Sequence, residues 1–82
     1  MKWQHSDRSK IDYDRLQQNI RKAFDKQVRF LADNLQHPSL HAKKYDERQD
    51  LWQARVNKDW RFYFKIDNDT IIITRIIPHP KK

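Results

Sequence analysis

The arginine and histidine side chains of this 82-residue chain are suited to one chemistry, which is the binding and cleavage of a phosphodiester. Arg55 and Arg61 lie in neighbouring segments of alternating hydrophobicity, and His79 lies between two prolines near the C-terminus. The planar fork of arginine binds phosphate through two hydrogen bonds, and histidine transfers protons near neutral pH. Cutting RNA through its own 2′-hydroxyl needs little more, because the substrate supplies the nucleophile. We therefore treat Arg55, Arg61 and His79 as candidate catalytic residues that converge at one end of a sheet.

Further cations and one tyrosine could contact RNA around these three residues. Each also has an ordinary structural explanation, as part of a solvated sheet face, as a cross-strand packing partner or as a basic tail. His79 has one too, as a surface histidine. The candidate RNA-binding residues are Lys43, Lys44, Tyr63, Lys65 and Lys81.

Three strands are predicted between residues 51 and 77. Apolar and polar residues alternate from Trp52 to Asn57 and again from Trp60 to Ile66, and residues 70–77 are rich in β-branched side chains. Polar turns at 57–59 and 67–69, where Asn and Asp tolerate a left-handed backbone, join the strands into an antiparallel meander. The aromatic residues then share one face of the sheet. The other face carries Arg55, Arg61, Tyr63 and Lys65, with Arg75 as a further candidate.

A long helix is predicted over residues 13–35, because apolar residues recur there at helical spacing. Asn34 and Pro38 provide its end. Upstream, Ser6 or Asp7 is placed to cap a short first helix, and residues 2–5 fit either an edge strand or a frayed terminus. A further strand is possible near residues 42–45. The expected fold is a single α+β domain over residues 1–82, with an antiparallel sheet of three to four strands and the helix or helices packed on one face.

Composition narrows the function further. The net charge of +7 favours a polyanionic partner such as RNA or DNA, although an acidic protein would also fit. The chain has no cysteine and no apolar run of membrane-spanning length, so we expect a cytoplasmic protein that does not enter the membrane. Its four histidines are scattered, and it has no glycine for a phosphate-cradling loop. Neither a metal nor a cofactor is expected.

The order of helix, polar connection and strands resembles the RelE/ParE toxin superfamily. The similar pattern is an aromatic and a basic residue on one strand (Trp52 and Arg55), a tight turn, the pair Trp60-Arg61, and a last strand that ends near His79. Residues 37–40 with 43–45 also look like the segment that joins helix and sheet in RelE-like members. The resemblance covers roughly residues 16–80.

This resemblance implies a RelE-like toxin of a type II toxin–antitoxin module. Such toxins enter the ribosomal A site, formed by 16S rRNA, and cleave mRNA without a metal, and a cognate antitoxin neutralises them. Carried over by position, Arg61 is a ligand of the phosphate and transition state, Arg55 a second basic group and His79 a proton-transfer candidate. Substrate contacts from Lys43 and Lys44, and a general base at Asp46 or Glu47, are looser matches. ParE-like members share the fold but inhibit DNA gyrase, and a non-catalytic binding module of the same fold is the third alternative.

Overall fold

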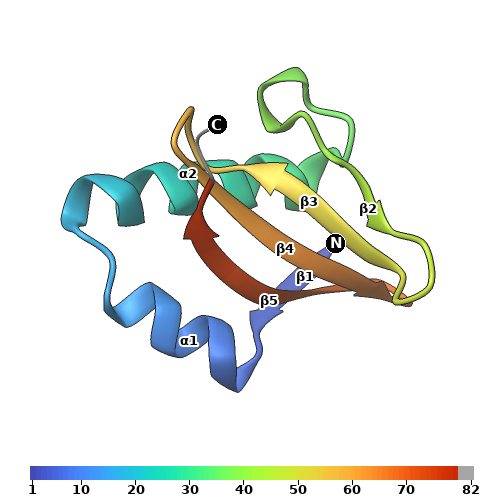
Figure 1. Ribbon diagram of the computed structural model, residues 1–82. Coiled ribbons are helices and arrows are strands. Elements are labelled where there is room, and N and C mark those ends of the chain that lie inside the picture. The colour runs from blue at the N-terminus through green and yellow to red at the C-terminus, as the bar shows by residue number, and fades with distance from the viewer. Residues whose placement is uncertain (80–82) are drawn as a thin grey trace.

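Five strands form one mixed sheet in the order β1-β5-β4-β3-β2 in the computed structural model, which describes residues 1–79 (Figure 1). Strands β2 to β5 pair antiparallel with their neighbours, whereas β1 runs parallel to β5, with Lys2 opposite Thr70 and His5 opposite Ile73. The strands are β1 (Lys2–His5), β2 (Lys43–Asp46), β3 (Leu51–Arg55), β4 (Trp60–Asp67) and β5 (Thr70–Pro78). The helices are α1 (Asp7–Asp14), α2 (Gln18–Asp33) and the 3-10 helix η1 (Pro38–Leu40).

The α+β class and the meander of the last three strands are confirmed, but the predicted count of three to four antiparallel strands was too low. The additional strand is β1, one of the two alternatives for residues 2–5. Its four residues are mostly polar and exposed, and its partner β5 lies at the other end of the sequence. No local pattern selects such a pairing, because it depends on contacts far apart along the chain.

Helix α2 covers one face of the sheet and builds the core with it (Figure 1). The rings of Phe24 and Phe62 meet edge-on with their centroids 5.2 Å apart, and both side chains are fully buried. Burying one such side chain stabilises the fold by about 1.5–3 kcal/mol. The buried core residues are Leu16, Ile20, Phe24, Val28, Leu31, Leu40, Ala54, Val56, Phe62, Phe64, Ile71, Ile73 and Ile76.

The predicted helix over residues 13–35 proved to be too long at both ends, because α2 spans Gln18–Asp33. Residues 15–17 separate α1 from α2, and Leu16 enters the core from that connection rather than from a helix. The Arg21 side chain donates hydrogen bonds to the carbonyl oxygens of Tyr13 (3.2 Å) and Asp14 (2.7 Å), which satisfies the end of α1. The cap at Ser6 is confirmed, since its hydroxyl accepts a hydrogen bond from the backbone of Ser9.

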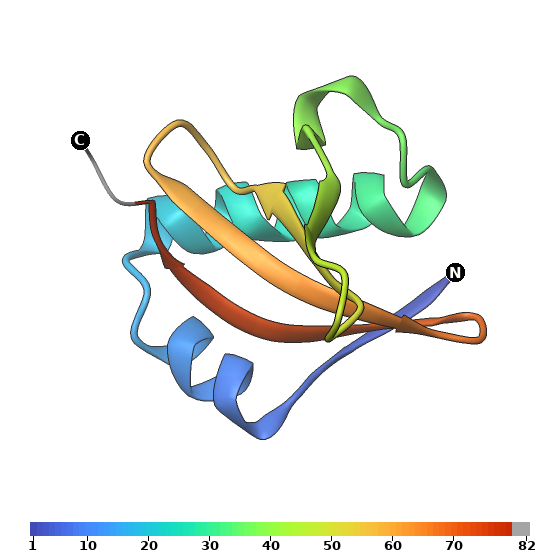
Figure 2. The same cartoon turned by 45° about the vertical axis from the view of Figure 1, so that its right-hand side comes forward.

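Helix α1 lies along the edge of β5 that β1 leaves uncovered (Figure 2). The backbone N–H of Ser6 donates to the carbonyl oxygen of Ile73 at 2.9 Å, directly beyond the last β1–β5 pair. Further along, the Asp12 carboxylate accepts a hydrogen bond from the backbone N–H of Ile76 at 3.0 Å. A side chain of α1 therefore replaces the backbone partner that a longer β1 would have supplied.

The two predicted turns use their asparagines differently. Asn68 has φ of 56°, the left-handed conformation expected of it. Asn57 does not adopt that conformation; its side-chain oxygen instead accepts hydrogen bonds from the backbone N–H groups of Asp59 (2.8 Å) and Trp60 (2.9 Å). The second arrangement closes the β3–β4 turn with a side chain and fixes the start of β4.

Within residues 1–79, no helix is both long enough and apolar enough to cross a membrane.

Candidate functional site

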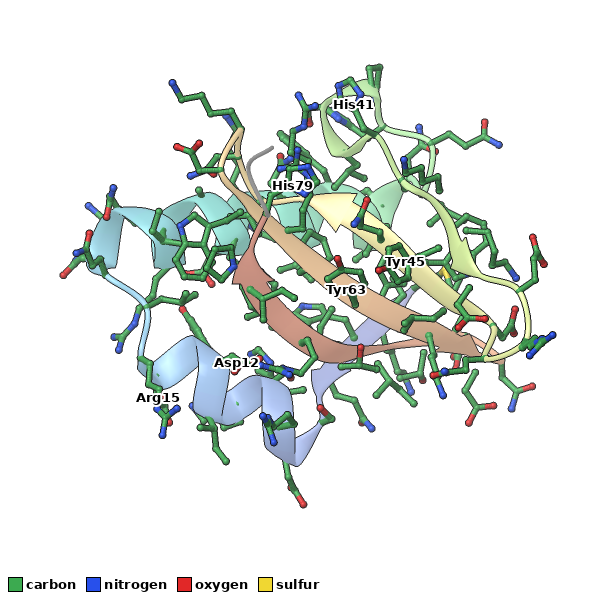
Figure 3. The ribbon with its side chains drawn as sticks, viewed as in Figure 1. Asp12, Arg15, His41, Tyr45, Tyr63 and His79 are labelled. Carbon is green, nitrogen blue, oxygen red and sulfur yellow. The ribbon has the colours of Figure 1, made fainter. Side chains whose placement is uncertain are left out.

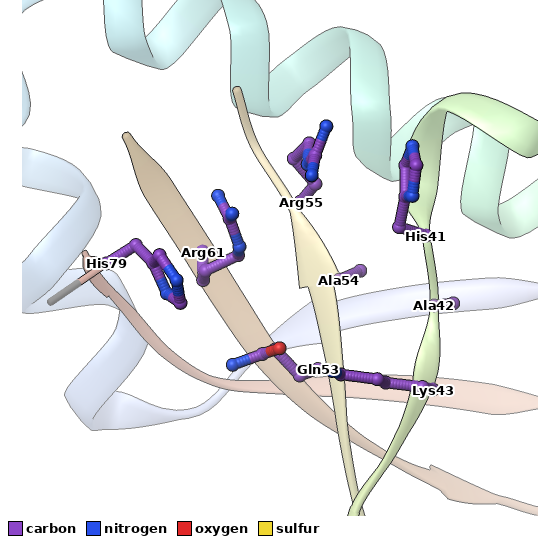
Figure 4. Close-up of a pocket in the computed structure, with 8 residues that line it drawn as sticks. All are labelled: His41, Ala42, Lys43, Gln53, Ala54, Arg55, Arg61 and His79. Carbon is purple, nitrogen blue, oxygen red and sulfur yellow. The ribbon is translucent and has the colours of Figure 1, made fainter. Parts of the chain in front are cut away.

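A pocket of about 390 Å³ opens on the face of the sheet that α2 leaves uncovered (Figure 4). It is surrounded by side chains of β2, β3 and β4. The residues just before β2 and just after β5 complete its wall. Four of the predicted site residues, Lys43, Arg55, Arg61 and His79, meet here. We call this site the basic pocket; its lining residues are His41, Ala42, Lys43, Gln53, Ala54, Arg55, Arg61 and His79.

Strand register explains why distant cations meet. Arg55 and Arg61 are direct partners across the β3–β4 pair, and Lys43 is the partner of Gln53 across β2–β3. Side chains of directly opposed residues lie on the same face of a sheet. His79 joins them because its backbone N–H donates to the carbonyl oxygen of Asp59 at 2.7 Å, which attaches the end of β5 to the β3–β4 turn.

Arg61 is held rigidly by the turn that precedes it. Its Nη1 donates to the carbonyl oxygens of Asn57 (2.7 Å) and Trp60 (2.9 Å), so these bonds use only one edge of the guanidinium. Partial burial, and secondly the positive charge of Arg55, lower the pKa of Arg61. Two guanidinium groups held close together repel one another, and a bound anion would relieve that repulsion.

Arg55 is fixed from beneath by a buried glutamine that sequence reasoning missed. Gln27 of α2 donates from Nε2 to the carbonyl oxygens of Arg55 (2.9 Å) and Ser39 (3.1 Å), and its own oxygen accepts from the Ser39 hydroxyl (3.2 Å). The buried Nε of Arg55 has no hydrogen-bond partner within residues 1–79. Gln27 therefore joins helix α2, η1 and the end of β3, the strand that carries Arg55.

His41 and Gln53 line the basic pocket and were also missed. His41 follows η1 with φ of 48°, a left-handed conformation that redirects the chain into β2. No sequence pattern announces that turn. Gln53 could have been found, because the alternation of β3 places it on the same face as Arg55.

Other predicted site residues lie outside the basic pocket. Lys44 is paired with Trp52, so it lies on the opposite face, where its ammonium group is 5.1 Å from the Trp52 ring and bonds to Asp50. That contact with Asp50 raises the pKa of Lys44. Lys65 is exposed further along β4 and does not line the pocket. Lys81 lies outside the described residues.

Tyr63 lies on the same face as the basic pocket, beside it on β4, and is buried there. Of the two suggested general bases, Asp46 is occupied by the β2–β3 turn, where its carboxylate accepts hydrogen bonds from the backbone of Arg48 (3.0 Å) and Gln49 (3.3 Å). Glu47 is exposed in that turn. Neither of these acidic residues lines the pocket. Within residues 1–79, no three His, Asp or Glu side chains gather as the ligands of a metal ion would.

Comparison with known proteins places this geometry in a family. Residues 5–81 match the family described as the ParE toxin of the type II toxin–antitoxin system parDE. No curated protein sequence matches the chain significantly.

Solved structures share the fold at low sequence identity. A YoeB/ParE toxin from Agrobacterium tumefaciens superposes with a TM-score of 0.82 at 14 % identity, over 98 % of this chain and 100 % of that one. The YoeB dimer from Staphylococcus aureus gives 0.79 at 19 % identity, over 98 % of both chains. The RelB–RelE antitoxin–toxin complex from Methanococcus jannaschii gives 0.73 at 17 % identity, over 90 % of this chain and 87 % of that one. The family match over residues 5–81 shows that the chain belongs to the family of ParE toxins of type II toxin–antitoxin systems.

Proposed function

We propose that this toxin is a ribosome-dependent mRNA endonuclease that works without a metal ion. The observation that carries the proposal is the basic pocket, in which Arg55, Arg61 and His79 converge on the uncovered face of the sheet. Two arginines are suited to holding the scissile phosphate, and a histidine is suited to moving a proton, in phosphodiester cleavage through the 2′-hydroxyl.

In the proposed reaction the two arginines hold the scissile phosphate. Attack by the 2′-oxygen on phosphorus forms a new P–O bond, and the bond to the 5′-oxygen breaks. The products are a 2′,3′-cyclic phosphate and a 5′-hydroxyl. Arg61 is already fixed by the turn, so little reorganisation is needed as negative charge develops.

Two proton transfers complete this reaction. One group removes the proton of the 2′-hydroxyl and another protonates the leaving 5′-oxygen. Figure 4 shows His79 and His41 on the two sides of the arginine pair, which supports these two histidines as the proton-transfer groups.

An antitoxin is the proposed protein partner, and mRNA on the ribosome the proposed target. The RelB–RelE structure from M. jannaschii and the YoeB–YefM structure from S. aureus are both toxin–antitoxin complexes with this fold. The net charge of +7 suits contact with ribosomal RNA and with an acidic neutralising segment alike. The cytoplasm is where such a target would be met.

Gyrase inhibition is the second candidate. The family that matches residues 5–81 is that of the ParE toxin, and ParE-like toxins are the members expected to inhibit DNA gyrase. Under that alternative the same basic face would bind the protein target, and mRNA would stay intact.

The deciding experiment is induction of this chain alone in a bacterial host, with mRNA 5′ ends mapped within minutes. Wild-type protein should produce new cuts within translated codons, and Arg61→Ala should abolish them while remaining folded. Arg8→Ala removes an exposed arginine of α1 away from the pocket and is the charge-matched control, which should cut as the wild type does. Growth arrest with intact mRNA and a DNA-damage response would establish gyrase inhibition instead. Folded protein without arrest would identify a binding module.

A further inference from the structure

Tyr45 presents an aromatic ring to solvent on the same face as the basic pocket. At 58 % exposure, it is the most exposed large apolar side chain within residues 1–79. Figure 3 shows it beside Tyr63 in front of the sheet, below His41 and His79. The other large apolar side chains exposed in the described chain are Met1, which precedes β1, Trp3 of β1 and Ile11 of α1. Tyr45 is thus the one that adjoins the basic pocket.

The Tyr45 ring is supported from one side. It meets the ring of Tyr63 at 76°, with the centroids 5.0 Å apart, which is a favourable edge-to-face arrangement. Tyr63 is itself immobilised: it is only 8 % exposed, and its hydroxyl accepts a hydrogen bond from Nε2 of Gln53 at 2.9 Å. A buried and hydrogen-bonded tyrosine therefore orients an exposed one.

Gln53 connects this aromatic pair to the cations. It lines the basic pocket and lies between Lys43 on β2 and Tyr63 on β4 as the direct partner of both. Tyr45 follows Lys43 by two positions along β2, a distance of roughly 7 Å in a strand. That separation is comparable with the distance between the phosphate and the base of one nucleotide.

Two acidic residues close to Tyr45 in the sequence are engaged, whereas Glu47 of the same turn is exposed. Asp46 accepts backbone hydrogen bonds from its own turn, and Asp50 is paired with Lys44. A polyanion that approaches Tyr45 therefore meets Lys43, Arg55 and Arg61 as the charges of the adjoining pocket.

We infer that Tyr45, oriented by Tyr63 and Gln53, is a stacking platform for a nucleobase of single-stranded RNA whose phosphate lies in the basic pocket. An aromatic platform beside a cationic groove is the combination by which proteins bind single strands. The inference rests on the proposed function, since it takes RNA as the substrate. Stacking on one aromatic residue contributes enough that its removal should weaken binding about 5- to 140-fold.

The test measures the dissociation constant of the toxin for ribosomes programmed with an mRNA whose A-site codon carries 2′-O-methyl groups, which block cleavage. Tyr45→Ala and Tyr45→Leu should weaken binding by the stated factor, because leucine keeps apolar area but has no aromatic face. Tyr45→Trp should retain wild-type affinity. Ile11→Ala, which removes an exposed apolar side chain of α1, is the matched control and should bind as the wild type does.

The outcomes separate this inference from the proposed function. If wild-type protein binds programmed ribosomes and Arg61→Ala does not, while Tyr45→Ala binds normally, the platform is refuted and the endonuclease proposal survives. Failure of the wild type to bind at all would refute both. If Tyr45→Ala weakened only the binding of a protein antitoxin, Tyr45 would be a protein contact, and the platform would again be refuted. Thermal unfolding of each variant verifies that the substitution leaves the fold unchanged.

Discussion

Asp12 and Arg75 are 63 positions apart in the sequence and form an ion pair of 2.7 Å between helix α1 and strand β5. The Asp12 side chain is 11 % exposed, and the same carboxylate accepts the backbone N–H of Ile76. One carboxylate thereby accepts hydrogen bonds both from the Arg75 side chain and from a backbone N–H at the open edge of β5. Arg75 is also the cross-strand partner of Tyr63, so this contact lies at the border of the surface proposed to bind RNA.

Asp12→Ala should lower the free energy of unfolding by about 2 kcal/mol. The Arg75 guanidinium and the partly buried backbone N–H of Ile76 would both lose the carboxylate that accepts their hydrogen bonds. Arg75 is more than a third exposed, so its share of that loss is reduced by solvent. Urea titration measures the change. Asp14→Ala is the matched control: it removes a carboxylate of the same helix whose pair with Lys10 is exposed, and it should cost less than about 0.5 kcal/mol. Equal losses for the two variants would contradict this account.

Gln27→Leu should lower the free energy of unfolding by about 2–3 kcal/mol. The two carbonyl oxygens that Gln27 satisfies, those of Ser39 and Arg55, would be left unpaired next to an apolar side chain of similar size. RNA cleavage should fall even at temperatures where the variant is folded, because the segments that carry Arg55 and His41 lose their common anchor. Urea titration and a cleavage assay on translating ribosomes provide the two measurements. Gln18→Leu, at an exposed position of the same helix, should change neither.

Stability should decrease below neutral pH in part through His5. Its ring stacks against those of Tyr13 and Phe24, with centroid distances of 5.4 and 5.8 Å. Burial, followed by the positive charge of Lys10, lowers the pKa of His5. The unfolded chain therefore binds the proton more readily than the folded chain. The stabilising contribution is present above the unfolded pKa of about 6.5 and is lost as the pH falls toward the lower folded pKa.

His5→Phe tests this dependence, because phenylalanine keeps the aromatic stack and cannot be protonated. The Ser9 hydroxyl, which pairs with His5 at 2.7 Å, still has the carbonyl oxygen of Ser6 as a partner. Urea titrations of both proteins at several pH values between 7.5 and 5 should show a shallower decline for the variant. Parallel curves would show that His5 does not contribute.

Sequence patterns predicted the part of the fold in which neighbouring segments pair. The alternation in β3 and β4 gave their faces correctly, since residues of one parity must meet a core. The break between the two predicted helices was placed too early, because Tyr13 and Leu16 continue the apolar spacing of α2, although the chain turns between them. Periodicity records which residues face the core, and it does not record whether one helix carries them all.

In the candidate site, too, strand parity was predictable from the sequence, and contacts between distant segments were not. The shared face of Arg55 and Arg61 follows from strand parity. Gln27 could not be found, because a glutamine inside an amphipathic helix gains its role only from the carbonyl groups of Ser39 and Arg55 brought to it by the fold. Lys44 was misplaced relative to Lys43 for a simpler reason: adjacent residues of a strand point to opposite faces.

The parallel pairing of β1 with β5 has a consequence for synthesis of the protein. Residues 2–5 find their partners at residues 70–73, so a nascent chain cannot complete its sheet until almost the whole sequence has left the ribosome. Contacts of such long sequence separation form late and slow folding. Products of interrupted translation would lack the strand that closes this sheet and the histidine that follows it. A chain that stops before residue 70 therefore lacks both the partner of β1 and one lining residue of the basic pocket, His79.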